Sequence, residues 1–576
     1  MIFFKKKTIS YKGYSIPENE AYRISLTWKF FFMLLMLLSG ILLSTAFPPF
    51  NCSIFAFIAL APLIVLAIQN PVGKNLFRYG YLWGFGWSFC SFFWLREINW
   101  LVPYLVALVI ALWGGIYALS VSFFHRWGMR GSDSLTYDFR KLNELEIPWY
   151  RGIIFSVICG CFFIMLEFIR IKMFPWNFIG ITQYRELWLI QIVKWTGIYG
   201  VSFLLAGMNG AIAFAIWMLI GKLKGRKNSY TAIFSGVVFF AFLIAASCVY
   251  GFFECRRVEN EYEKGKVCRL GAVQGDISQR RVSTQEMAKE ALDVYLDMSY
   301  ELLKMRPEII IWPETAVPYP YYGGNIISGQ YRSGVYQLIR SGKIPLLIGT
   351  LDFIINSEND YDMTNSAFLF SKDGFVKAKY SKINRVPFGE FIPFRKYLPE
   401  KLVAAVDMGR DLRAGNDASP LEILPGVRAG VAVCYESIFA SLARNEVNLG
   451  ANMLLAINND AWYPESSEPE QHCANAVFRA VENNIVSLRC GNNGATVLIL
   501  PSGKIGWSLS GHLLKRERRA GVVEVKITDR LQKTFYTKYG DVFLLLVFIC
   551  GIAASGYSFC QYFSALNMLR KKEKED

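Results

Sequence analysis

Three side chains that could carry out acyl transfer each stand at the end of an apolar, β-rich run. They are Glu314 in the motif Trp-Pro-Glu-Thr-Ala, Lys382 after Tyr-Ser, and Cys434 after Val-Ala-Val. Strand ends are where α/β domains hold their sites. A carboxylate, an ammonium and a thiol that converge there would form a site for nucleophilic acyl transfer.

The chemistry explains why these residue types are needed. A thiol has a reference pKa of about 8.5 and is mostly protonated at neutral pH, and an apolar strand end raises that pKa further, so a base must lie beside it. Glu314 can take the proton, and burial behind Trp312 and Pro313 would raise its basicity. Lys382 can stabilise the oxyanion of a tetrahedral intermediate, an effect worth about 3 to 4 kcal/mol per donor. No histidine is required.

Each residue also has a simpler interpretation when it is taken alone. Cys434 fits a small buried residue of an interior strand. Glu314 fits a helix N-cap or a surface carboxylate, and Lys382 fits a solvated lysine beside Lys377 and Lys379. The combination of the three motifs, rather than any single residue, favours catalysis.

The elements that must position these residues include a membrane part. Of the 576 residues, 53% are hydrophobic and 16% aromatic, and the apolar residues form blocks long enough to cross a bilayer. We therefore predict an α-helical membrane bundle of eight transmembrane helices. The predicted spans are residues 30–47, 52–69, 78–95, 102–124, 152–170, 197–220, 232–253 and 541–563.

The basic residues predict the orientation of this bundle. The formal net charge is +16, but Lys and Arg lie mostly at the chain ends and in short loops between apolar blocks. That pattern sets membrane topology, and no nucleic-acid-binding module is recognisable. Both termini are expected in the cytoplasm. We predict a membrane domain with seven helices over residues 1–254, an extracytoplasmic catalytic domain over 255–538, and an eighth helix with a basic tail over 539–576.

The extracytoplasmic segment alternates strand and helix patterns, which predicts an α/β layered domain. A capping box over residues 283–286 predicts a helix start, and Lys372-Asp373-Gly374 and Ser502-Gly503 predict turns. The aromatic segment 174–194 has two open interpretations, an interfacial segment or a packing loop. The predicted strands are the apolar, β-rich runs at residues 270–273, 309–312, 346–349, 431–434, 453–457 and 485–488.

The 12 cysteines and three histidines have no metal-binding spacing, so neither a metal site nor a cofactor is predicted. Most cysteines lie inside apolar blocks and fit small buried residues. Spacing leaves open whether Cys268, Cys473 and Cys490 form disulfides, whereas Cys434 must stay reduced to act.

Together the motifs resemble the signatures of the apolipoprotein N-acyltransferase family. The similarity rests on Trp-Pro-Glu-Thr-Ala at 312–316, on the spacing from Lys382 to the Val-Pro-Phe-Gly-Glu run at 386–390, and on Cys-Tyr-Glu at 434–436. Motifs at 174–176, 200–203, 274–275, 458–462 and 479–483 extend it over nearly the whole chain. The resemblance implies a nitrilase-like αββα sandwich resting on eight helices.

The resemblance also implies the roles of individual residues. Cys434 would be the nucleophile, Glu314 the base and Lys382 the oxyanion-stabilising lysine. Supporting positions would be Glu390, Glu436, Tyr435 and Trp462. Arg385 stands where the family usually has an apolar residue, and Asp276 where Asn is more usual; these departures concern substrate preference and not reaction type.

The family reaction takes an acyl chain from a membrane phospholipid as a thioester, then passes it to the α-amino group of the N-terminal diacylglyceryl-cysteine of a prolipoprotein. The implied location is the bacterial inner membrane, with the catalytic domain periplasmic and the protein a monomer. A membrane site also spares the enzyme from extracting acyl chains, at about 0.8 kcal/mol per methylene. Alternatives are a membrane-tethered amidase or nitrilase, and a transporter or receptor with an enzyme-like outer domain.

Overall fold

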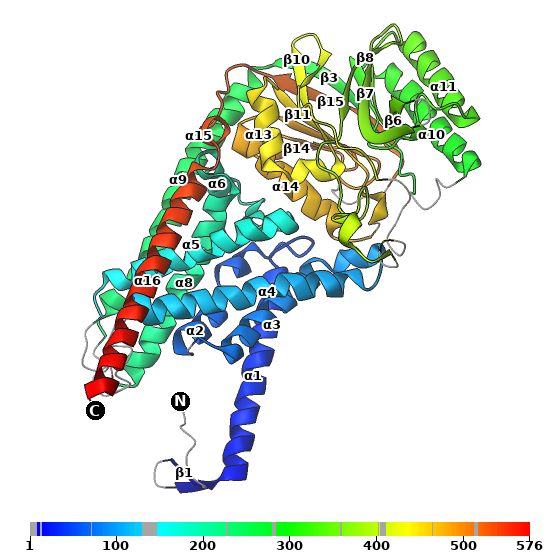
Figure 1. Cartoon of the computed structure of the whole chain (residues 1–576). Coiled ribbons are helices and arrows are strands. Elements are labelled where there is room, and N and C mark those ends of the chain that lie inside the picture. The colour runs from blue at the N-terminus through cyan, green and yellow to red at the C-terminus, as the bar shows by residue number, and fades with distance from the viewer. Residues whose placement is uncertain are drawn as a thin grey trace. The chain divides into compact units, whose positions relative to one another are not determined.

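The computed structural model describes residues 8–11, 14–70, 72–129, 147–225, 228–278, 284–357, 360–400, 403, 411–463, 465–511 and 517–575. Contacts divide the chain into two compact units (Figure 1). The helical unit comprises Met1–Phe174, Ser202–Leu243 and Leu546–Asp576, and the α/β unit comprises Pro175–Val201 and Ile244–Leu545. The predicted boundaries at residues 254 and 538 stay predictions, because contacts group residues by packing and not by position in a membrane.

Long apolar helices dominate the helical unit. Among the described residues, six helices are long and apolar enough to cross a membrane: Thr27–Ser44, Val102–Gly128, Tyr150–Met173, Ile198–Leu223, Tyr230–Glu263 and Val542–Ser564. The helices and short strands that contribute residues to this unit are β1 (Thr8–Tyr11), β2 (Tyr14–Pro17), α1 (Glu18–Ser44), η1 (Ser53–Phe57), α2 (Ala61–Gln69), α3 (Lys74–Ser91), η2 (Phe93–Glu97), α4 (Val102–Phe123), η3 (Phe124–Gly128), α5 (Tyr150–Met173), α8 (Ile198–Leu223), α9 (Tyr230–Glu263) and α16 (Val542–Glu575).

The predicted count of eight spans is therefore not reached by these helices. The block 52–69 forms the short helices η1 and α2, and the block 78–95 falls mainly on α3. Helix α3 begins with Lys74, Asn75 and Arg78 and is rich in Gly, Tyr and Trp, which lowers its hydropathy. Several apolar helices are shown, and the exact number of crossings stays a prediction.

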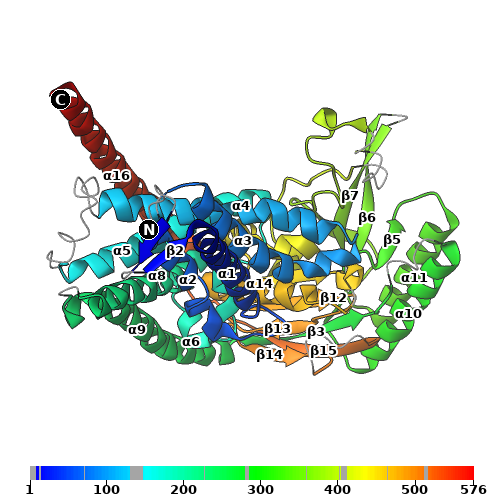
Figure 2. The ribbon, with the colours of Figure 1, turned by 90° about the horizontal axis from the view of Figure 1, so that it is seen from below.

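Small residues bring α3 and α4 together (Figure 2). A Cβ atom on Gly80 would lie 2.3 Å from the carbonyl oxygen of Gly114, and one on Gly84 would lie 2.9 Å from the Cα atom of Ala111. Such close backbone approach is how helices associate when lipid removes the hydrophobic drive between them. A larger side chain at Gly80 would push the two helices apart.

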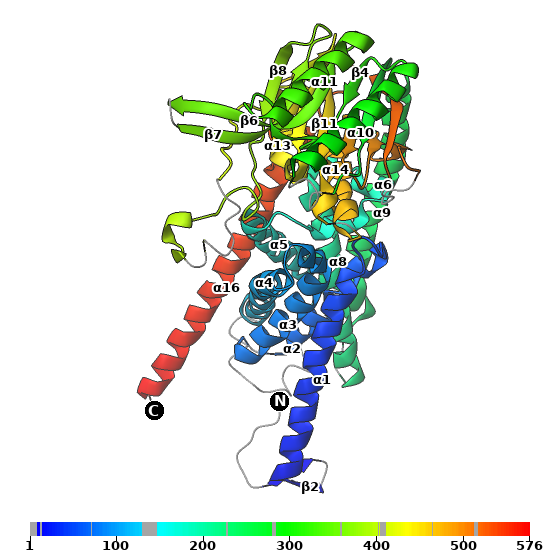
Figure 3. The ribbon, with the colours of Figure 1, turned by 90° about the vertical axis from the view of Figure 1, so that its right-hand side faces the viewer.

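The α/β unit contains two sheets. The strand order is β14-β13-β12-β11-β10-β9 in one sheet and β15-β3-β4-β6-β7-β8 in the other, where β5 also pairs with β6. Strands β6 and β7 form a long hairpin that extends beyond its neighbours (Figure 3). The strands are β3 (Lys266–Gln274), β4 (Ile309–Ile311), β5 (Val317–Pro320), β6 (Leu346–Ser357), β7 (Asp360–Phe370), β8 (Val376–Ser381), β9 (Leu421–Leu424), β10 (Val427–Val433), β11 (Met453–Asn458), β12 (Ser487–Gly491), β13 (Val497–Ile499), β14 (Ile505–Ser508) and β15 (Arg519–Ile527).

Side-chain alternation separates the layers of this unit. In β4, Ile309 and Ile311 join the core between the two sheets, whereas Ile310 joins a second core beneath α10 (Gln285–Lys304) and α11 (Ile326–Gly342). On the opposite face, α13 (Ala440–Asn448) and α14 (Glu468–Asn483) cover the other sheet. The period of two along a strand thus produces helix, sheet, sheet and helix layers. All six predicted strand regions overlap strands, although Ile485 and Val486 precede β12, and Thr284 caps α10 through the Met287 amide.

The segment Pro175–Val201 packs within the α/β unit. It includes η6 (Ile179–Gln183), α6 (Leu187–Ile190) and α7 (Val193–Thr196). Trp176 Nε1 donates to Gln471 Oε1 at 3.0 Å, and the Ile198 amide donates to Glu482 Oε1 at 3.1 Å. Most of its side chains are buried. Of the two interpretations of this segment, the structure supports the packing one.

Candidate active site

Two strands of one sheet deliver the predicted base and lysine to the same edge. Glu314 follows β4 and Lys382 follows β8. Strand β4 pairs with β6 in parallel, and the two antiparallel steps from β6 through β7 to β8 restore that direction. The carboxyl ends of β4 and β8 therefore lie at one edge of the sheet. Cys434 follows β10 of the facing sheet, so the site lies where the two sheets meet.

The loop that carries Glu314 needs a close backbone approach. A Cβ atom on Gly349 of β6 would lie 2.4 Å from the Pro313 carbonyl oxygen and 2.6 Å from the Cα atom of Glu314. On the other side, Trp312 is fully buried and donates from Nε1 to Ser299 Oγ at 2.9 Å. Gly349 and Trp312 together hold the Glu314 backbone in place.

Lys382 lies between two carboxylates. Its Nζ atom is 2.9 Å from Glu390 Oε1 and 3.5 Å from Glu314 Oε1. Asn365 Nδ2 donates to the same two oxygens, at 2.8 Å to Glu314 and 3.1 Å to Glu390. We call Glu314, Lys382 and Glu390 the catalytic cluster. Because the lysine side chain is only 2% exposed, its charge is balanced by protein carboxylates instead of water.

The thiol of Cys434 faces this cluster. It lies close enough to Glu314 and to the Asn459 amide for both to influence its pKa. The backbone φ of Cys434 is +54°, in the left-handed region that favours glycine. A non-glycine residue held there stores strain and requires support from its surroundings.

The two acids of the catalytic cluster have pKa values shifted in opposite directions. Burial raises the pKa of Glu314, aided by the Glu390 charge and opposed by Lys382. Burial also favours the neutral form of Glu390, but Lys382 outweighs it and lowers the pKa of Glu390. Burial would lower the pKa of Lys382, yet Glu390 and Glu314 together raise it. Glu390 is therefore the standing counter-ion and Glu314 the more basic carboxylate.

The thiol itself does not ionise without help. Burial raises the pKa of Cys434 well above its ordinary value, and the Glu314 charge raises it further against the opposing effect of Lys382. A neutral thiol beside a carboxylate of raised pKa is an arrangement for proton transfer when a substrate arrives. The site can therefore generate a thiolate and hold a cation close to it.

Glu436 ties the lysine segment to the cysteine segment. Its carboxylate accepts hydrogen bonds from the amides of Ile383 at 2.7 Å, Asn384 at 2.9 Å and Val433 at 2.9 Å. The Tyr380 hydroxyl donates to it as well, at 2.9 Å. Because the donors flank both Lys382 and Cys434, loss of this carboxylate would loosen both. Glu436 thus acts through backbone positions.

The two predicted aromatic positions differ in their surroundings. Tyr435 is partly buried and stacks on Trp176, with ring centroids 6.3 Å apart and planes at 10°. Trp462, at the end of η10 (Asp460–Trp462), is 47% exposed. Tyr435 therefore adjoins Cys434 within the packed interior, whereas the role of Trp462 stays a prediction.

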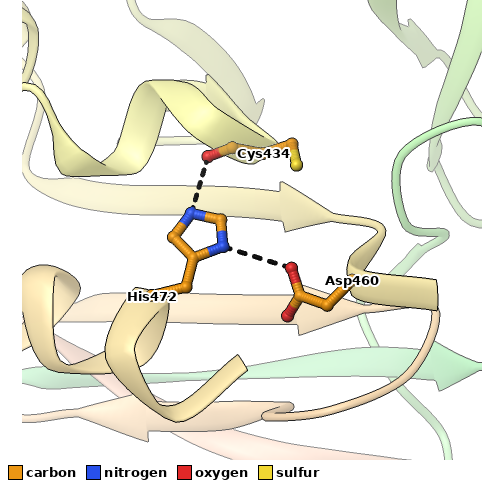
Figure 4. A group of neighbouring side chains, drawn as sticks. All are labelled: Cys434, Asp460 and His472. Atoms are coloured by element: carbon orange, nitrogen blue, oxygen red, sulfur yellow. Dashed lines mark hydrogen bonds and ion pairs between the residues drawn. The ribbon is translucent and has the colours of Figure 1, made fainter. Parts of the chain in front are cut away.

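Sequence reasoning missed a second buried group beside the thiol. Asp460, Glu468, His472 and Arg489 are all at least 97% buried, and we call them the histidine cluster. His472 Nδ1 lies 3.1 Å from Asp460 Oδ1 and 3.3 Å from Glu468 Oε1, and Arg489 pairs with Asp460. Figure 4 shows Asp460 and His472 beside Cys434. The sequence did hold one signal of this cluster: Arg489 is a charged residue inside the apolar strand β12. Asn365 had a weaker one, because it lies in the polar run 364–366 just before the apolar end of β7.

Cys434, Asp460 and His472 also offer one potential metal ligand each, within 4.8 Å of one another. The surrounding charges oppose a metal ion there. Asp460 already pairs with Arg489, and Lys382 favours ionisation of Cys434 as a second nearby cation. A divalent ion would have to enter beside these two positive charges. We therefore assign no metal to these residues.

Comparison with known proteins first defines the class. The carbon-nitrogen hydrolase family model matches residues 269–512, which contain the whole candidate site. A crystal structure of a carbon-nitrogen hydrolase from Helicobacter pylori is 16% identical, with a TM-score of 0.33, over 45% of this chain and 89% of that one. By its match to this family model, and not by that structural likeness, the α/β unit contains a nitrilase-like domain of the carbon-nitrogen hydrolase class.

The helical unit and the relatives then define the family. The model of the apolipoprotein N-acyltransferase N-terminal domain matches residues 39–211. An apolipoprotein N-acyltransferase of Geobacter metallireducens is 32% identical over 88% of this chain and 92% of its own length. Another, of Methylococcus capsulatus, is 29% identical over 82% and 86%. The chain belongs to the apolipoprotein N-acyltransferase family.

Proposed function

We propose that this protein transfers a fatty acyl chain from a membrane phospholipid to the α-amino group of the N-terminal diacylglyceryl-cysteine of prolipoproteins, with Cys434 carrying the acyl chain. The observation that carries the proposal is the convergence of the Cys434 thiol, the basic Glu314 and the buried Lys382 in a chain of this family. The apolar helices supply a route by which both lipid substrates reach the enzyme without leaving the bilayer.

In the first half-reaction Glu314 accepts the thiol proton while Cys434 Sγ attacks the phospholipid ester carbonyl. The C=O π electrons become an oxyanion, which the Lys382 ammonium stabilises. Collapse of this intermediate breaks the ester C–O bond, and Glu314 returns the proton to the departing lysophospholipid oxygen. The enzyme then holds a thioester.

In the second half-reaction the α-amino group of the diacylglyceryl-cysteine attacks the thioester carbonyl and gives a proton to Glu314. Collapse of the second tetrahedral intermediate breaks the C–S bond, and the proton returns to the sulfur. Glu390 keeps Lys382 protonated throughout, because the two form the shortest ion pair of the catalytic cluster.

The test is intact-mass analysis of the full chain in detergent with phospholipid. We expect an adduct of one acyl chain on the wild type and none on Cys434→Ser. Cys473→Ser and Cys490→Ser are matched controls, since both are buried free thiols of the same unit and should leave the adduct unchanged. An adduct that survives Cys434→Ser would contradict the proposal.

Addition of a diacylglyceryl peptide then distinguishes transfer from hydrolysis. We expect the adduct to disappear as triacylated peptide forms, without release of free fatty acid. Free fatty acid with unmodified peptide would instead support an amidase-like or nitrilase-like hydrolase.

We also propose the finer topology: eight crossings, both termini cytoplasmic, the catalytic domain periplasmic, and a monomer. The distribution of Lys and Arg supports this orientation, because basic residues collect near residues 74–78 and 222–227 and at the C-terminus. A reporter enzyme active only in the periplasm, fused after residue 254, should be active. Activity of the same reporter fused after residue 576 would contradict the proposed orientation.

A further inference from the structure

His472 contacts the backbone of the cysteine and not its thiol. Its Nε2 atom lies 3.0 Å from the Cys434 carbonyl oxygen (Figure 4). Nε2 also lies 2.8 Å from the Ser437 hydroxyl oxygen. A carbonyl oxygen only accepts hydrogen bonds, so Nε2 donates the proton in its bond to Cys434. An Nε2 atom that donates to this carbonyl is not available to remove the thiol proton. The grouping of cysteine, histidine and aspartate therefore does not form a catalytic triad of the serine-protease type.

The other edge of the ring is anchored by charged groups. Nδ1 faces Asp460 Oδ1 at 3.1 Å and Arg489 Nη2 at 3.1 Å, with Glu468 Oε1 at 3.3 Å. Asp460 is itself held by Arg489 from β12. Contacts on both edges therefore fix the direction of the imidazole relative to Cys434.

The peptide that His472 holds is the one that follows the nucleophile. Cys434 has a φ of +54°, a strained conformation. In a planar trans peptide the carbonyl oxygen and the next amide hydrogen point in opposite directions. A hydrogen bond that fixes the Cys434 carbonyl therefore also fixes the direction of the Tyr435 N–H, away from His472.

We propose that His472 is a positioning residue for acyl transfer: its bond to the Cys434 carbonyl holds the peptide between Cys434 and Tyr435, so that the Tyr435 N–H joins Lys382 in stabilising the oxyanion. This inference rests on the proposed thioester chemistry of Cys434. It predicts a selective defect. Steps that form an oxyanion depend on His472, and steps that need only the thiol do not.

The experiment compares two reactions of Cys434 in the full chain. The burst of p-nitrophenol from p-nitrophenyl butyrate passes through an oxyanion, whereas alkylation by iodoacetamide does not. We expect His472→Leu to slow the burst about 10- to 100-fold, less than the roughly 100- to 1,000-fold loss when an oxyanion donor is removed outright, because the Tyr435 N–H is misdirected and not deleted. The alkylation rate should change less than about threefold. His472→Gln retains an N–H donor and should restore the burst to within about fivefold of the wild type.

Matched variants separate positioning from folding. Cys473→Ala alters the neighbouring buried residue of α14 and should match the wild type in both reactions. If His472→Leu does not fold, Asp460→Asn serves instead, because it weakens the anchor of the His472 ring without changing the side-chain volume. It should show the same selective loss of the burst, but a smaller one. Equal losses in burst and alkylation, or a Gln variant as slow as Leu, would overturn the proposal.

The choice of substrate keeps this test distinct from that of the proposed function. A wild type that gives a Cys434-dependent burst with the nitrophenyl ester but no adduct with phospholipid would refute the proposed function alone. A wild type with no Cys434-dependent burst would refute both. The His472 result is therefore read from the burst and alkylation rates, whatever lipid the enzyme uses.

Discussion

The catalytic cluster and the histidine cluster are built alike but face different groups. In each, one carboxylate pairs closely with a buried cation, Glu390 with Lys382 and Asp460 with Arg489. In each, that acid has a lowered pKa. The second acid of each cluster, Glu314 or Glu468, has a pKa raised chiefly by burial.

What differs is the atom that each cluster presents to Cys434. Glu314 meets the thiol, which has a proton to give, whereas His472 meets the carbonyl, which has none. Composition alone does not give a buried, charge-balanced cluster its role. In the roles proposed above, the cluster that faces the thiol serves proton transfer, and the cluster that faces the carbonyl holds a backbone in place.

Replacement of the proposed base, Glu314, should cause the largest loss of activity. Glu314→Gln keeps the shape and the acceptor for Asn365 but cannot take the thiol proton, so we expect acyl-enzyme formation to fall by about 10³-fold or more. Rapid-quench mass analysis of a single turnover measures this rate. The matched variant Glu468→Gln, which removes the equivalent acid of the histidine cluster, should stay within about tenfold of the wild type. Comparable losses in the two variants would erase the distinction between the clusters.

Removal of the lysine should affect both activity and stability. Lys382→Met takes the cation from between two carboxylates, so we expect a loss of about 10² to 10³ in rate and of about 3 to 5 kcal/mol in unfolding free energy. Adding Glu390→Gln to this variant removes one unpaired carboxylate. The double variant should regain stability without regaining activity. Denaturation midpoints in detergent decide the point, and equal stability of single and double variants would show that the pair is not charge-coupled.

Chemical types at strand ends could be predicted from the sequence, and so could six strand regions. Glu314 and Cys434 follow short apolar runs that form β4 and the end of β10. Lys382 follows β8, which was not among the predicted strand regions because lysines alternate with its apolar residues. The pairing of strands in the sheet sets further contacts, which local sequence patterns do not contain. Asn365 meets Glu314 only because β7 lies beside β8 and β6 in the fold.

Helix α14 illustrates the same limit. Its sequence is rich in polar residues, yet all sixteen of its residues are buried. Part of the cover comes from Pro175–Val201, nearly three hundred residues earlier in the chain, through contacts such as Trp176 to Gln471. A burial of this kind depends on tertiary contacts between distant segments, which periodicity does not encode. His472 was missed for that reason.

The histidine cluster should make stability depend on pH through Glu468. Burial, with the Asp460 charge, raises the pKa of Glu468 to about 7 from an ordinary 4.5. A raised folded-state pKa means that the native state binds the proton more tightly than the unfolded state. The contribution is fully present below pH 4.5 and is lost as the pH rises to about 7.

Glu468→Gln should remove this dependence. Because one pKa unit corresponds to about 1.4 kcal/mol, we expect the variant to be more stable than the wild type at pH 8, by on the order of 2 to 3 kcal/mol, and little different at pH 4.5. Unfolding free energies at the two pH values test the sign. A wild type whose stability rises relative to the variant between pH 4.5 and 7 would show that Glu468 is a stabilising carboxylate like Glu390.

The smallest effect is expected at Glu446, a buried acid that belongs to neither cluster. It is 1% exposed, and burial, followed by the Glu436 charge, raises its pKa well above the ordinary value. Within the described part of the chain it forms no ion pair. Glu446 should therefore be protonated at neutral pH, and Glu446→Gln should alter the unfolding free energy by less than about 1 kcal/mol and the rate by less than about twofold. A loss above about 3 kcal/mol would mean that Glu446 carries a charge with a partner, and that pairing with a cation is not what separates the two clusters from other buried acids.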